Sequence, residues 1–386
     1  MNFNRKINRQ QTQSVKYDFI ETLNKPEDTI PMWVADMDFS APPQVIKALV
    51  ERAEHGVFGY SEIDERYCQA VNNWFQTHFN WQIDPDTLVT TPGIVYAINT
   101  AIRALTKKGD AILIQEPVYN PFKCAIENNK RQTIVNPLVF KENRYHIDFD
   151  DFENKIKSEN VVAFILCTPH NPVGRVWQEE ELKRIKEICQ RYDVLILSDE
   201  IHCDFVYPSN EHRMFETVNP DYAHRTITMT SPSKTFNLAG LQGSNIIIPD
   251  QALRSAFKKE MEKQGSAHLN AMSITATIAA YEEGAPWLED LLKYLQENIA
   301  LTQRFLEKEL PEIQLIPPEG TYLLWLDFKG LGLSDQEISE RLEKRCRIWL
   351  NAGSQYGVGG EGHWRLNVAT TRANLKEALR RLKKIR

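Results

Sequence analysis

The chain has 386 residues, of which 42% are hydrophobic and 25% are charged, and its formal net charge is −6 at pH 7. This length is enough for about two domains with sizeable cores. The acidic balance argues against nucleic acid or an anionic membrane as a partner, and charges interrupt every long apolar run, so no transmembrane span is expected. The N-terminal residues contain no apolar stretch typical of a signal peptide, and the six cysteines show no metal-type spacing. We therefore expect a cytoplasmic protein with reduced thiols.

The first part of the chain is expected to form an N-terminal arm, residues 1–45, that contributes to a small domain. The segment APPQVIKALVERA (41–53) is typical of a first helix leading into a larger domain, which we place at residues 46–286. The remainder, residues 287–386, is expected to form a smaller C-terminal domain.

From about residue 85, short apolar strands alternate with amphipathic helices. Strands are expected at 88–90, 111–115, 161–167, 193–198, 226–230 and 244–249. Between them, QEEELKRIKEICQRY (178–192) carries Leu182, Ile185 and Ile188 at helical spacing. Such alternation predicts an α/β fold, a mostly parallel sheet flanked by helices.

The C-terminal part reads differently, as a smaller α+β unit. A long helix is expected from about Trp287 to Leu310. Strands are then expected at YLLWLDF (322–328), RIWL (347–350) and HWRLNVA (363–369), with further helices between and after them.

Polar and aromatic residues follow five strands of the larger unit, each at the strand's carboxyl end. They are Thr91-Pro92-Gly93, Glu116-Pro117-Val118-Tyr119, the segment TPHNPVG (168–174) with Asn171, Asp199-Glu200-Ile201-His202, and Ser231-Pro232-Ser233-Lys234. In open α/β sheets, ligands bind beyond this edge. The five segments predict an anion cradle at a helix N-terminus, an aromatic ring, an amide, a carboxylate and a lysine on one rim.

That combination matches the needs of pyridoxal phosphate. The aldehyde needs an amine, the phosphate a helix N-terminus with hydroxyls, the pyridine nitrogen a carboxylate, and the ring an aromatic partner. Lys234 is then the Schiff-base lysine, because burial and a neighbouring cation lower the pKa of a lysine and make its amine a nucleophile and base.

Three of these segments, SPSKTFNLAGLQGSN, TPHNPVGRVW and SDEIHCDFVY, resemble those of fold-type-I pyridoxal-phosphate enzymes. With PMWVADMDF (31–39), the chain resembles the MalY/PatB group of cystathionine β-lyases, or carbon–sulfur lyases, over nearly its whole length. The resemblance implies elimination from L-cystathionine or related cysteine S-conjugates, giving pyruvate, ammonia and a thiol. It also implies a homodimer that acts on a small amino acid and shares its active sites between subunits.

The resemblance also implies residue roles. Lys234, Tyr119 and Tyr60 are expected to be catalytic, with Tyr119 stacked on the ring and Tyr60 reaching the phosphate of the other subunit. The expected cofactor-binding residues also include Gly93, Ile94, Val95, Asn171, Asp199, His202, Ser231, Ser233 and Gln242. The expected substrate-binding residues are Arg365, as a clamp for the α-carboxylate, with Val34, Ala35 and Asn171.

The chain departs from the wider aminotransferase pattern at two positions. Gln242 stands where those enzymes usually have a phosphate-binding arginine, and His202 where they have a tyrosine. Both departures are typical of the lyase group.

Other interpretations remain open for single motifs. Lys234 alone could be a surface lysine, Asp199 a helix N-cap, and Arg365 part of a structural ion pair. The helicase-like DEIH (199–202) lacks a P-loop partner, because the chain has no Gly-Lys dipeptide. No metal site is expected from His202 with Asp199 and Asp204, and GVGGEG (357–362) precedes a strand, unlike a dinucleotide-binding turn.

Two other functions use the same residues. An aminotransferase acting on an amino acid and a 2-oxo acid needs the same cofactor groups, and a regulatory protein could use the fold as a binding surface. The sequence does not identify the preferred sulfur amino acid.

Overall fold

In the computed structural model, the structure describes residues 1–20, 22–265 and 268–386. Its largest sheet has seven strands in the order β2-β10-β9-β8-β7-β3-β4. The bounds are β2 (Leu88–Thr91), β3 (Ala111–Ile114), β4 (Gln132–Val135), β7 (Val161–Cys167), β8 (Leu195–Asp199), β9 (Thr226–Thr230) and β10 (Ser244–Ile247). Strands β9, β8, β7, β3 and β4 pair in parallel, and β10 is antiparallel to both of its neighbours. The predicted α/β fold with a mostly parallel sheet is confirmed.

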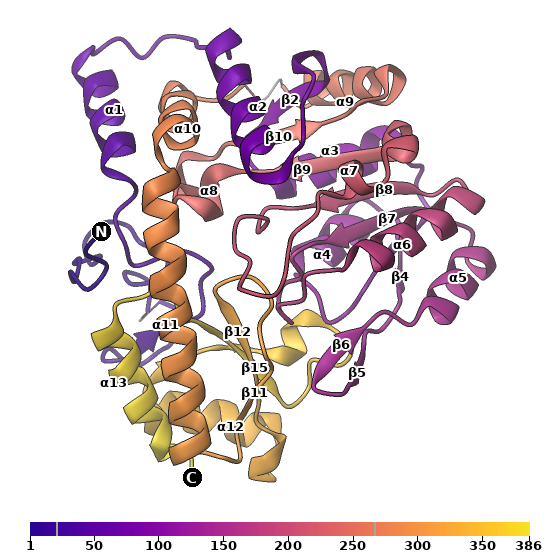
Figure 1. Cartoon of the computed structure of the whole chain (residues 1–386). Coiled ribbons are helices and arrows are strands. Elements are labelled where there is room, and N and C mark those ends of the chain that lie inside the picture. The colour runs from indigo at the N-terminus through magenta and orange to yellow at the C-terminus, as the bar shows by residue number, and fades with distance from the viewer. Residues whose placement is uncertain (21, 266–267) are drawn as a thin grey trace.

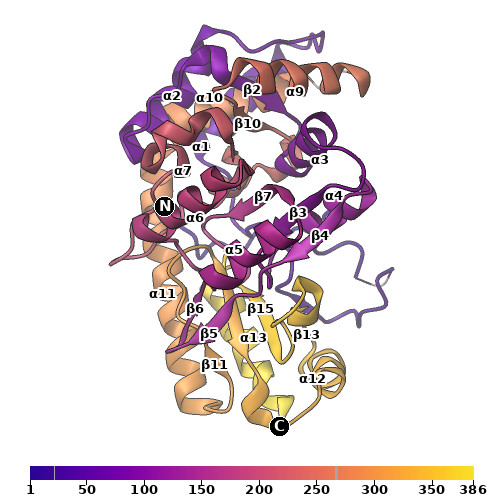
Figure 2. The same cartoon turned by 90° about the vertical axis from the view of Figure 1, so that its right-hand side faces the viewer.

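Helices cover both faces of this sheet, as Figures 1 and 2 show. On one face, Ile112 and Ile114 of β3 pack in a core with α3 (Ile94–Leu105), α4 (Pro121–Asn128) and α9 (Gln251–Lys263). On the other face, Leu113 packs in a core with α5 (Phe149–Ser158), α6 (Glu179–Arg191) and α7 (Phe215–Val218). Successive residues of β3 therefore pack into the cores on opposite faces of the sheet, because the side chains of a strand alternate between its two faces.

Helix α6 shows why the local sequence folds as it does. The Glu181 carboxylate accepts a hydrogen bond from the Gln178 backbone N–H at 2.8 Å, which closes the start of the helix. Three glutamates in the first turn, Glu179 to Glu181, complement the positive end of the helix dipole. Leu182, Ile185 and Ile188 are buried, as their spacing predicts.

A second, four-stranded antiparallel sheet has the order β11-β12-β15-β14. It comprises β11 (Gln314–Leu315), β12 (Leu323–Asp327), β14 (Asn351–Ala352) and β15 (His363–Asn367), with α11 (Ala285–Glu309), α12 (Asp335–Arg341) and α13 (Arg372–Leu382) around it. Figure 1 shows α11 as a long vertical helix that runs from the larger sheet's side down to this one.

The remaining elements lie outside these two sheets. Near the N-terminus, β1 (Ile30–Pro31) pairs in parallel with β13 (Ile348–Trp349). Helices α1 (Pro43–Glu54), α2 (Glu65–Phe79) and α10 (Ala271–Glu283) pack together, α8 (Pro232–Thr235) follows β9, and β5 (Val139–Lys141) forms a hairpin with β6 (Arg144–His146). The domain limits expected at residues 45 and 287 stay a prediction.

The sheets differ from the sequence expectations in some details. Strand β4 was not expected, because its residues Gln132–Val135 are exposed or half-buried at the sheet edge and lack a continuous apolar run. The segment 347–350 does not form one strand: β13 pairs with β1, and the following β14 pairs with β15.

No helix of the described residues has the length and apolar character needed to cross a membrane.

Candidate functional site

The five strand-end segments line one cavity of about 170 Å³ at the carboxyl edge of the large sheet. The expected site residues that line it are Ala35, Gly93, Ile94, Val95, Tyr119, Asn171, Asp199, His202, Ser231, Ser233, Lys234 and Gln242. Strand β2 runs in the same direction as β9, because both are antiparallel to β10. The carboxyl ends of β2, β3, β7, β8 and β9 therefore meet at this edge, which is why segments distant in sequence converge.

The N-terminus of α3 forms one wall of the cavity. Gly93 occupies the N-cap with φ +137°, a conformation that favours glycine, and no side chain caps the helix. The first-turn N–H groups of a helix have no intrahelical partner, and the helix dipole adds positive potential. Ile94 and Val95 therefore present backbone donors where an anion would be stabilised.

Ser231 and Ser233 lie beside this wall, at the end of β9. The Ser231 hydroxyl oxygen accepts the Ser233 N–H at 3.0 Å and lies 2.8 Å from the Ser233 hydroxyl oxygen. It also donates to the Gly243 carbonyl oxygen at 2.6 Å. These bonds fix the turn that carries Lys234.

Lys234 faces the cavity, and its Nζ donates a hydrogen bond to the Ala35 carbonyl oxygen at 2.7 Å. Burial, followed by the charge of Arg365, lowers the pKa of Lys234 to about 8, although Asp36 and Asp199 oppose the shift. A lysine in this environment supplies a free amine far more readily than a solvated lysine does.

Asp199 is the last residue of β8 and is 5% exposed. Burial raises the pKa of Asp199 to about 7, although the hydrogen bond from the Ile201 N–H at 3.1 Å favours the ionised form. No helix begins here, so the N-cap interpretation is wrong. A buried carboxyl of this kind is ionised fully when a cation or a strong donor approaches it.

Asn171, in the segment that follows β7, lines the cavity, and Arg365 of β15 reaches it from outside the cavity lining. Arg365 Nη1 donates to Asn171 Oδ1 at 2.9 Å, and Nη2 donates to the Trp33 carbonyl oxygen at 2.7 Å. Arg365 is 4% exposed, its Nε has no hydrogen-bond partner among the described residues, and none of their carboxylates forms an ion pair with it. The structural ion-pair interpretation is therefore wrong, and this buried guanidinium has only neutral acceptors, which suits it to an anionic ligand.

His202 lies beside the same cavity and is neutral. Burial, with the charges of Lys234 and Arg365, lowers the pKa of His202 to about 3. Its Nδ1 is buried without a hydrogen-bond partner among the described residues. Asp204 does not join it, because its carboxylate accepts hydrogen bonds from Trp74 Nε1 at 3.1 Å and from the Thr235 hydroxyl at 2.6 Å. The described parts of the chain hold no metal-type cluster of three or more His, Cys, Asp or Glu.

Tyr60 and Val34 are not brought to the cavity within the chain. Tyr60 is fully exposed, on a loop where Val57 and Phe58 are also exposed. Val34 does not line the cavity; its carbonyl oxygen accepts a hydrogen bond from Asn367 Nδ2 at 2.5 Å.

Sequence reasoning missed two residues that hold the site, Tyr322 and Asn367. Tyr322 donates from its hydroxyl to the Ala35 carbonyl oxygen at 3.0 Å, which also accepts from Lys234. Asn367 Nδ2 bridges the carbonyl oxygens of Val34 and Asp36. Asn367 follows Arg365 by two positions on β15, so both side chains lie on the same face of the strand. The alternation of side chains along a strand could therefore have identified Asn367.

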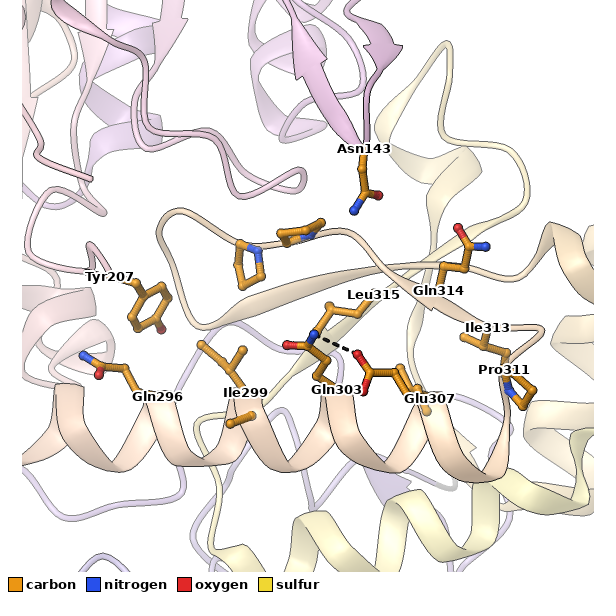
Figure 3. A pocket seen from close by; sticks show the side chains of 14 residues that line it. Asn143, Tyr207, Gln296, Ile299, Gln303, Glu307, Pro311, Ile313, Gln314 and Leu315 are labelled. Atoms are coloured by element: carbon orange, nitrogen blue, oxygen red, sulfur yellow. Dashed lines mark hydrogen bonds between the residues drawn. The ribbon is translucent and has the colours of Figure 1, made fainter. Parts of the chain in front are cut away.

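A larger cavity, about 600 Å³, lies between α11 and the segment around Pro317 (Figure 3). Its polar lining comes largely from amides, and Gln303 Nε2 already donates to the carboxylate of Glu307 at 2.9 Å. It lies away from the strand ends and offers no arrangement of nucleophile and base among its lining residues. The smaller cavity is therefore the candidate site.

Known proteins resemble the whole chain. The family model "Aminotransferase class I and II" matches residues 27–382. The chain is 43% identical to cystathionine beta-lyase PatB of Bacillus subtilis (strain 168) over 383 residues, which cover 99% of each protein. Among solved structures, cystalysin of Treponema denticola, which contains a pyridoxal 5′-phosphate cofactor, has a TM-score of 0.96 at 37% identity and covers 100% of this chain and 98% of its own.

The pyridoxal-phosphate-bound C–S lyase of Staphylococcus hominis is similarly close, with a TM-score of 0.93 at 35% identity over 100% of this chain and 98% of its own. These similarities extend over both sheets and all five strand-end segments. The chain therefore belongs to the aminotransferase class I and II family and, within it, to the pyridoxal-phosphate-dependent carbon–sulfur lyases of the MalY/PatB type.

Proposed function

We propose that this protein is a carbon–sulfur β-lyase that converts L-cystathionine or a related cysteine S-conjugate, with water, into a thiol, pyruvate and ammonia. One observation carries the proposal: an amine with a pKa of about 8, Lys234, shares a cavity with a buried carboxyl, Asp199, and with Asn171, whose amide oxygen binds Arg365. The identity to a cystathionine β-lyase supports elimination as the reaction.

The residues present fit pyridoxal 5′-phosphate. Asp199 is buried with its pKa raised, and a protonated pyridine nitrogen would give it the donor that favours its ionised form. The N–H groups after Gly93 and the hydroxyls of Ser231 and Ser233 would bind the phosphate, while Tyr119 would stack on the ring. The cofactor, when bound, supplies an aldehyde for amines and a ring that delocalises the electron pair left at the substrate's α-carbon.

Gln242 and His202 are two neutral hydrogen-bond donors that line the same cavity. Gln242 lines the cavity near Ser231 and Gly243, where it would add an amide N–H to the phosphate site. With no arginine at this position, the phosphate's charge would depend more heavily on the dipole of α3. His202, whose lowered pKa keeps it neutral, would offer one N–H to the ring's 3-oxygen, beside the amide of Asn171.

Arg365 would hold the substrate. Its guanidinium has only neutral acceptors, Asn171 Oδ1 and the Trp33 carbonyl oxygen, so a substrate α-carboxylate would gain a charge-assisted, bidentate pair. Binding there orients the α-carbon, because the carboxylate is attached to it. Ala35 and Val34 would border the same substrate from the backbone side.

Lys234 would move the protons. Its Nζ, with a pKa of about 8, is the base that removes the α-proton of the oriented substrate. The electron pair left at the α-carbon then forms a Cα–Cβ double bond as the Cβ–S bond breaks and its own electron pair leaves with sulfur. The proton on Nζ or a tyrosine hydroxyl such as that of Tyr119 can neutralise the departing thiolate, and water hydrolyses the released enamine to pyruvate and ammonia.

The assembly belongs to the same proposal. The exposed apolar side chains of Val57, Phe58 and Tyr60 form a surface that is typical of an interface. We propose a homodimer in which Tyr60 of each copy reaches the phosphate site of the other copy. A cytoplasmic location and the domain limits at residues 45 and 287 are part of this proposal.

The test supplies purified holoenzyme with L-cystathionine, with and without an added 2-oxo acid, and measures pyruvate. A lyase forms pyruvate without the 2-oxo acid, because elimination completes the cycle. Pyruvate absent under that condition, together with amino transfer to the 2-oxo acid, would establish an aminotransferase instead.

A further inference from the structure

The segment 33–39, here called the strap, holds both cations of the site through its backbone. The Ala35 carbonyl oxygen accepts a hydrogen bond from Lys234 Nζ at 2.7 Å. The Trp33 carbonyl oxygen accepts one from Arg365 Nη2 at 2.7 Å. The position of the strap therefore sets where an amine and a guanidinium lie.

The strap belongs to neither sheet. One backbone bond, from the Asp38 N–H to the Ala369 carbonyl oxygen at 2.9 Å, and several side chains hold it in place. Asn367 Nδ2 binds the carbonyl oxygens of Val34 and Asp36 at 2.5 and 2.6 Å. Asn237 binds both the N–H and the carbonyl oxygen of Met37 at 3.0 Å. Because these bonds come from single side chains, the geometry of the strap depends on each anchor.

The strongest anchors come from residues 3–18; from here on, "the arm" means these residues alone and not the whole of residues 1–45. Arg9 binds Asp36 Oδ2 at 2.5 Å and Asp38 Oδ1 at 2.9 Å. Lys16 Nζ lies 3.0 Å from Asp38 Oδ1 and 3.4 Å from Asp36 Oδ1. Two cations of the arm thus share two carboxylates of the strap.

This four-charge cluster is largely buried. Lys16 is 1% exposed and Asp38 is 6% exposed. Burial alone would raise the pKa of Asp38, but Lys16, the Thr370 hydroxyl and Arg9 together hold it below its ordinary value. Removing one partner of such a cluster leaves an uncompensated buried charge, which the strap can relieve by moving towards water.

The arm itself is fixed by an apolar contact. The Phe3 ring packs edge-on against Phe39 at a centroid distance of 5.0 Å and against Trp287 at 5.6 Å. The Asn4 side chain accepts a hydrogen bond from the Tyr294 hydroxyl at 2.7 Å. The arm is therefore docked independently of its charges, so loss of one ion pair loosens the strap without releasing the whole arm.

We propose that Arg9 and Lys16 are positioning residues for the lyase reaction. Their ion pairs with Asp36 and Asp38 lock the strap so that its carbonyl oxygens hold Lys234 and Arg365. The expected changes in KM and kcat rest on the proposed function. The expected loosening of the strap rests on its contacts alone.

Two effects follow when the lock is broken. Arg365 loses a fixed acceptor and binds the substrate carboxylate less well, which raises KM. Lys234 loses its fixed acceptor and is less often aligned with the α-proton, which lowers kcat. We expect kcat/KM to fall by about tenfold, less than the ~10²-fold that a 1 Å misplacement costs.

The experiment compares Arg9→Gln with Arg9→Lys, Lys16→Met and the matched control Arg131→Met, all as holoenzymes. The Arg9 side chain is 21% exposed, so Arg9→Gln is tolerated even where Lys16→Met fails to fold. Arg131 is a cation that is 9% exposed and donates to the carbonyl oxygens of Ile102 and Thr106, at the opposite end of the large sheet from the site. Kinetics and hydrogen–deuterium exchange of a peptide covering residues 33–39 are measured for each.

In Arg9→Gln we expect a higher KM, a lower kcat and faster exchange of the strap peptide, with most of each change reversed in Arg9→Lys. Arg131→Met should leave all three unchanged after correction for its stability. Equal kinetics and exchange in Arg9→Gln and the wild type would overturn the inference. If the wild type binds the cofactor yet forms no pyruvate, the proposed function fails. The exchange rate of the strap peptide in Arg9→Gln still tests whether the ion pairs fix the strap.

Discussion

The amine of Lys234 should titrate far below an ordinary lysine, and Arg365 should be one cause. The perturbation is Arg365→Met in the apo-protein, which removes a neighbouring positive charge and keeps the aliphatic bulk. Burial is the larger cause of the lowered pKa and Arg365 the next, while Asp36 and Asp199 act in the opposite direction. The pKa should therefore rise above 8 in the variant and remain below 10.5, because the burial persists.

The consequence for reactivity is large. With a pKa of 8, about 9% of Lys234 is the free amine at pH 7, compared with about 0.03% at the ordinary lysine value of 10.5, a ratio of roughly 300. Each unit by which Arg365→Met raises the pKa costs about tenfold in free amine at neutral pH. Loss of activity in this variant would then reflect weaker carboxylate binding together with a smaller fraction of free amine.

The assay is competitive trace acylation of the apo-protein across pH, with mass spectrometry of the peptides that contain Lys234 and the exposed Lys47. The control is Arg386→Met, which removes a surface charge paired with Glu312 at the far end of the molecule. A wild-type midpoint above about 10, or a midpoint that Arg365→Met does not move upwards, would refute the electrostatic account.

Three other predictions use the same site. Borohydride reduction of the holoenzyme should attach the cofactor to Lys234, and Lys234→Ala should abolish that label; mapping of the label to another lysine would contradict the assignment. Asp199→Asn should lower activity by more than tenfold while raising the Tm of the apo-protein by a few degrees at pH 8 and not at pH 4. The sign of this change in Tm follows from the raised pKa of Asp199, about 7 in the folded state. The carboxyl destabilises the folded state only where it is ionised in the unfolded chain, from about pH 4 upwards, and the full effect is reached above pH 7. A variant with unchanged Tm at pH 8, or with more than a tenth of the wild-type rate, would contradict this role. Mixed dimers of Tyr60→Phe and Lys234→Ala chains should regain activity, because one shared site then has both groups intact; no recovery despite verified subunit exchange would show that the two residues do not act across an interface.

The strand-end residues could be predicted because their placement follows from topology. Once Asp199 and Lys234 are seen to follow buried strands of one parallel sheet, their meeting at its carboxyl edge is required. Arg365 was harder, since its strand belongs to the other sheet, and its place beside Asn171 depends on how the two sheets pack. Only the family resemblance pointed to it.

The strap and its lock could not be predicted in the same way. Trp33 and Ala35 act through backbone carbonyl oxygens, which every residue has, so their side chains give no signal. Asp36 and Asp38 look like ordinary surface carboxylates until the arm covers them. The direction of strand β10 could not be predicted either. The 13 residues between β9 and β10 are enough for a parallel or an antiparallel connection, so the length of this segment does not indicate that β10 pairs antiparallel to β9.

The most direct test of the central claim is the stoichiometry of products from L-cystathionine in the absence of any 2-oxo acid. The account predicts that the wild-type holoenzyme releases homocysteine and pyruvate in equal amounts over many turnovers, and that Lys234→Ala, which lacks the proposed base, releases neither. Pyruvate formation that persists in Lys234→Ala, or wild-type holoenzyme that forms no pyruvate until a 2-oxo acid is added, would contradict it.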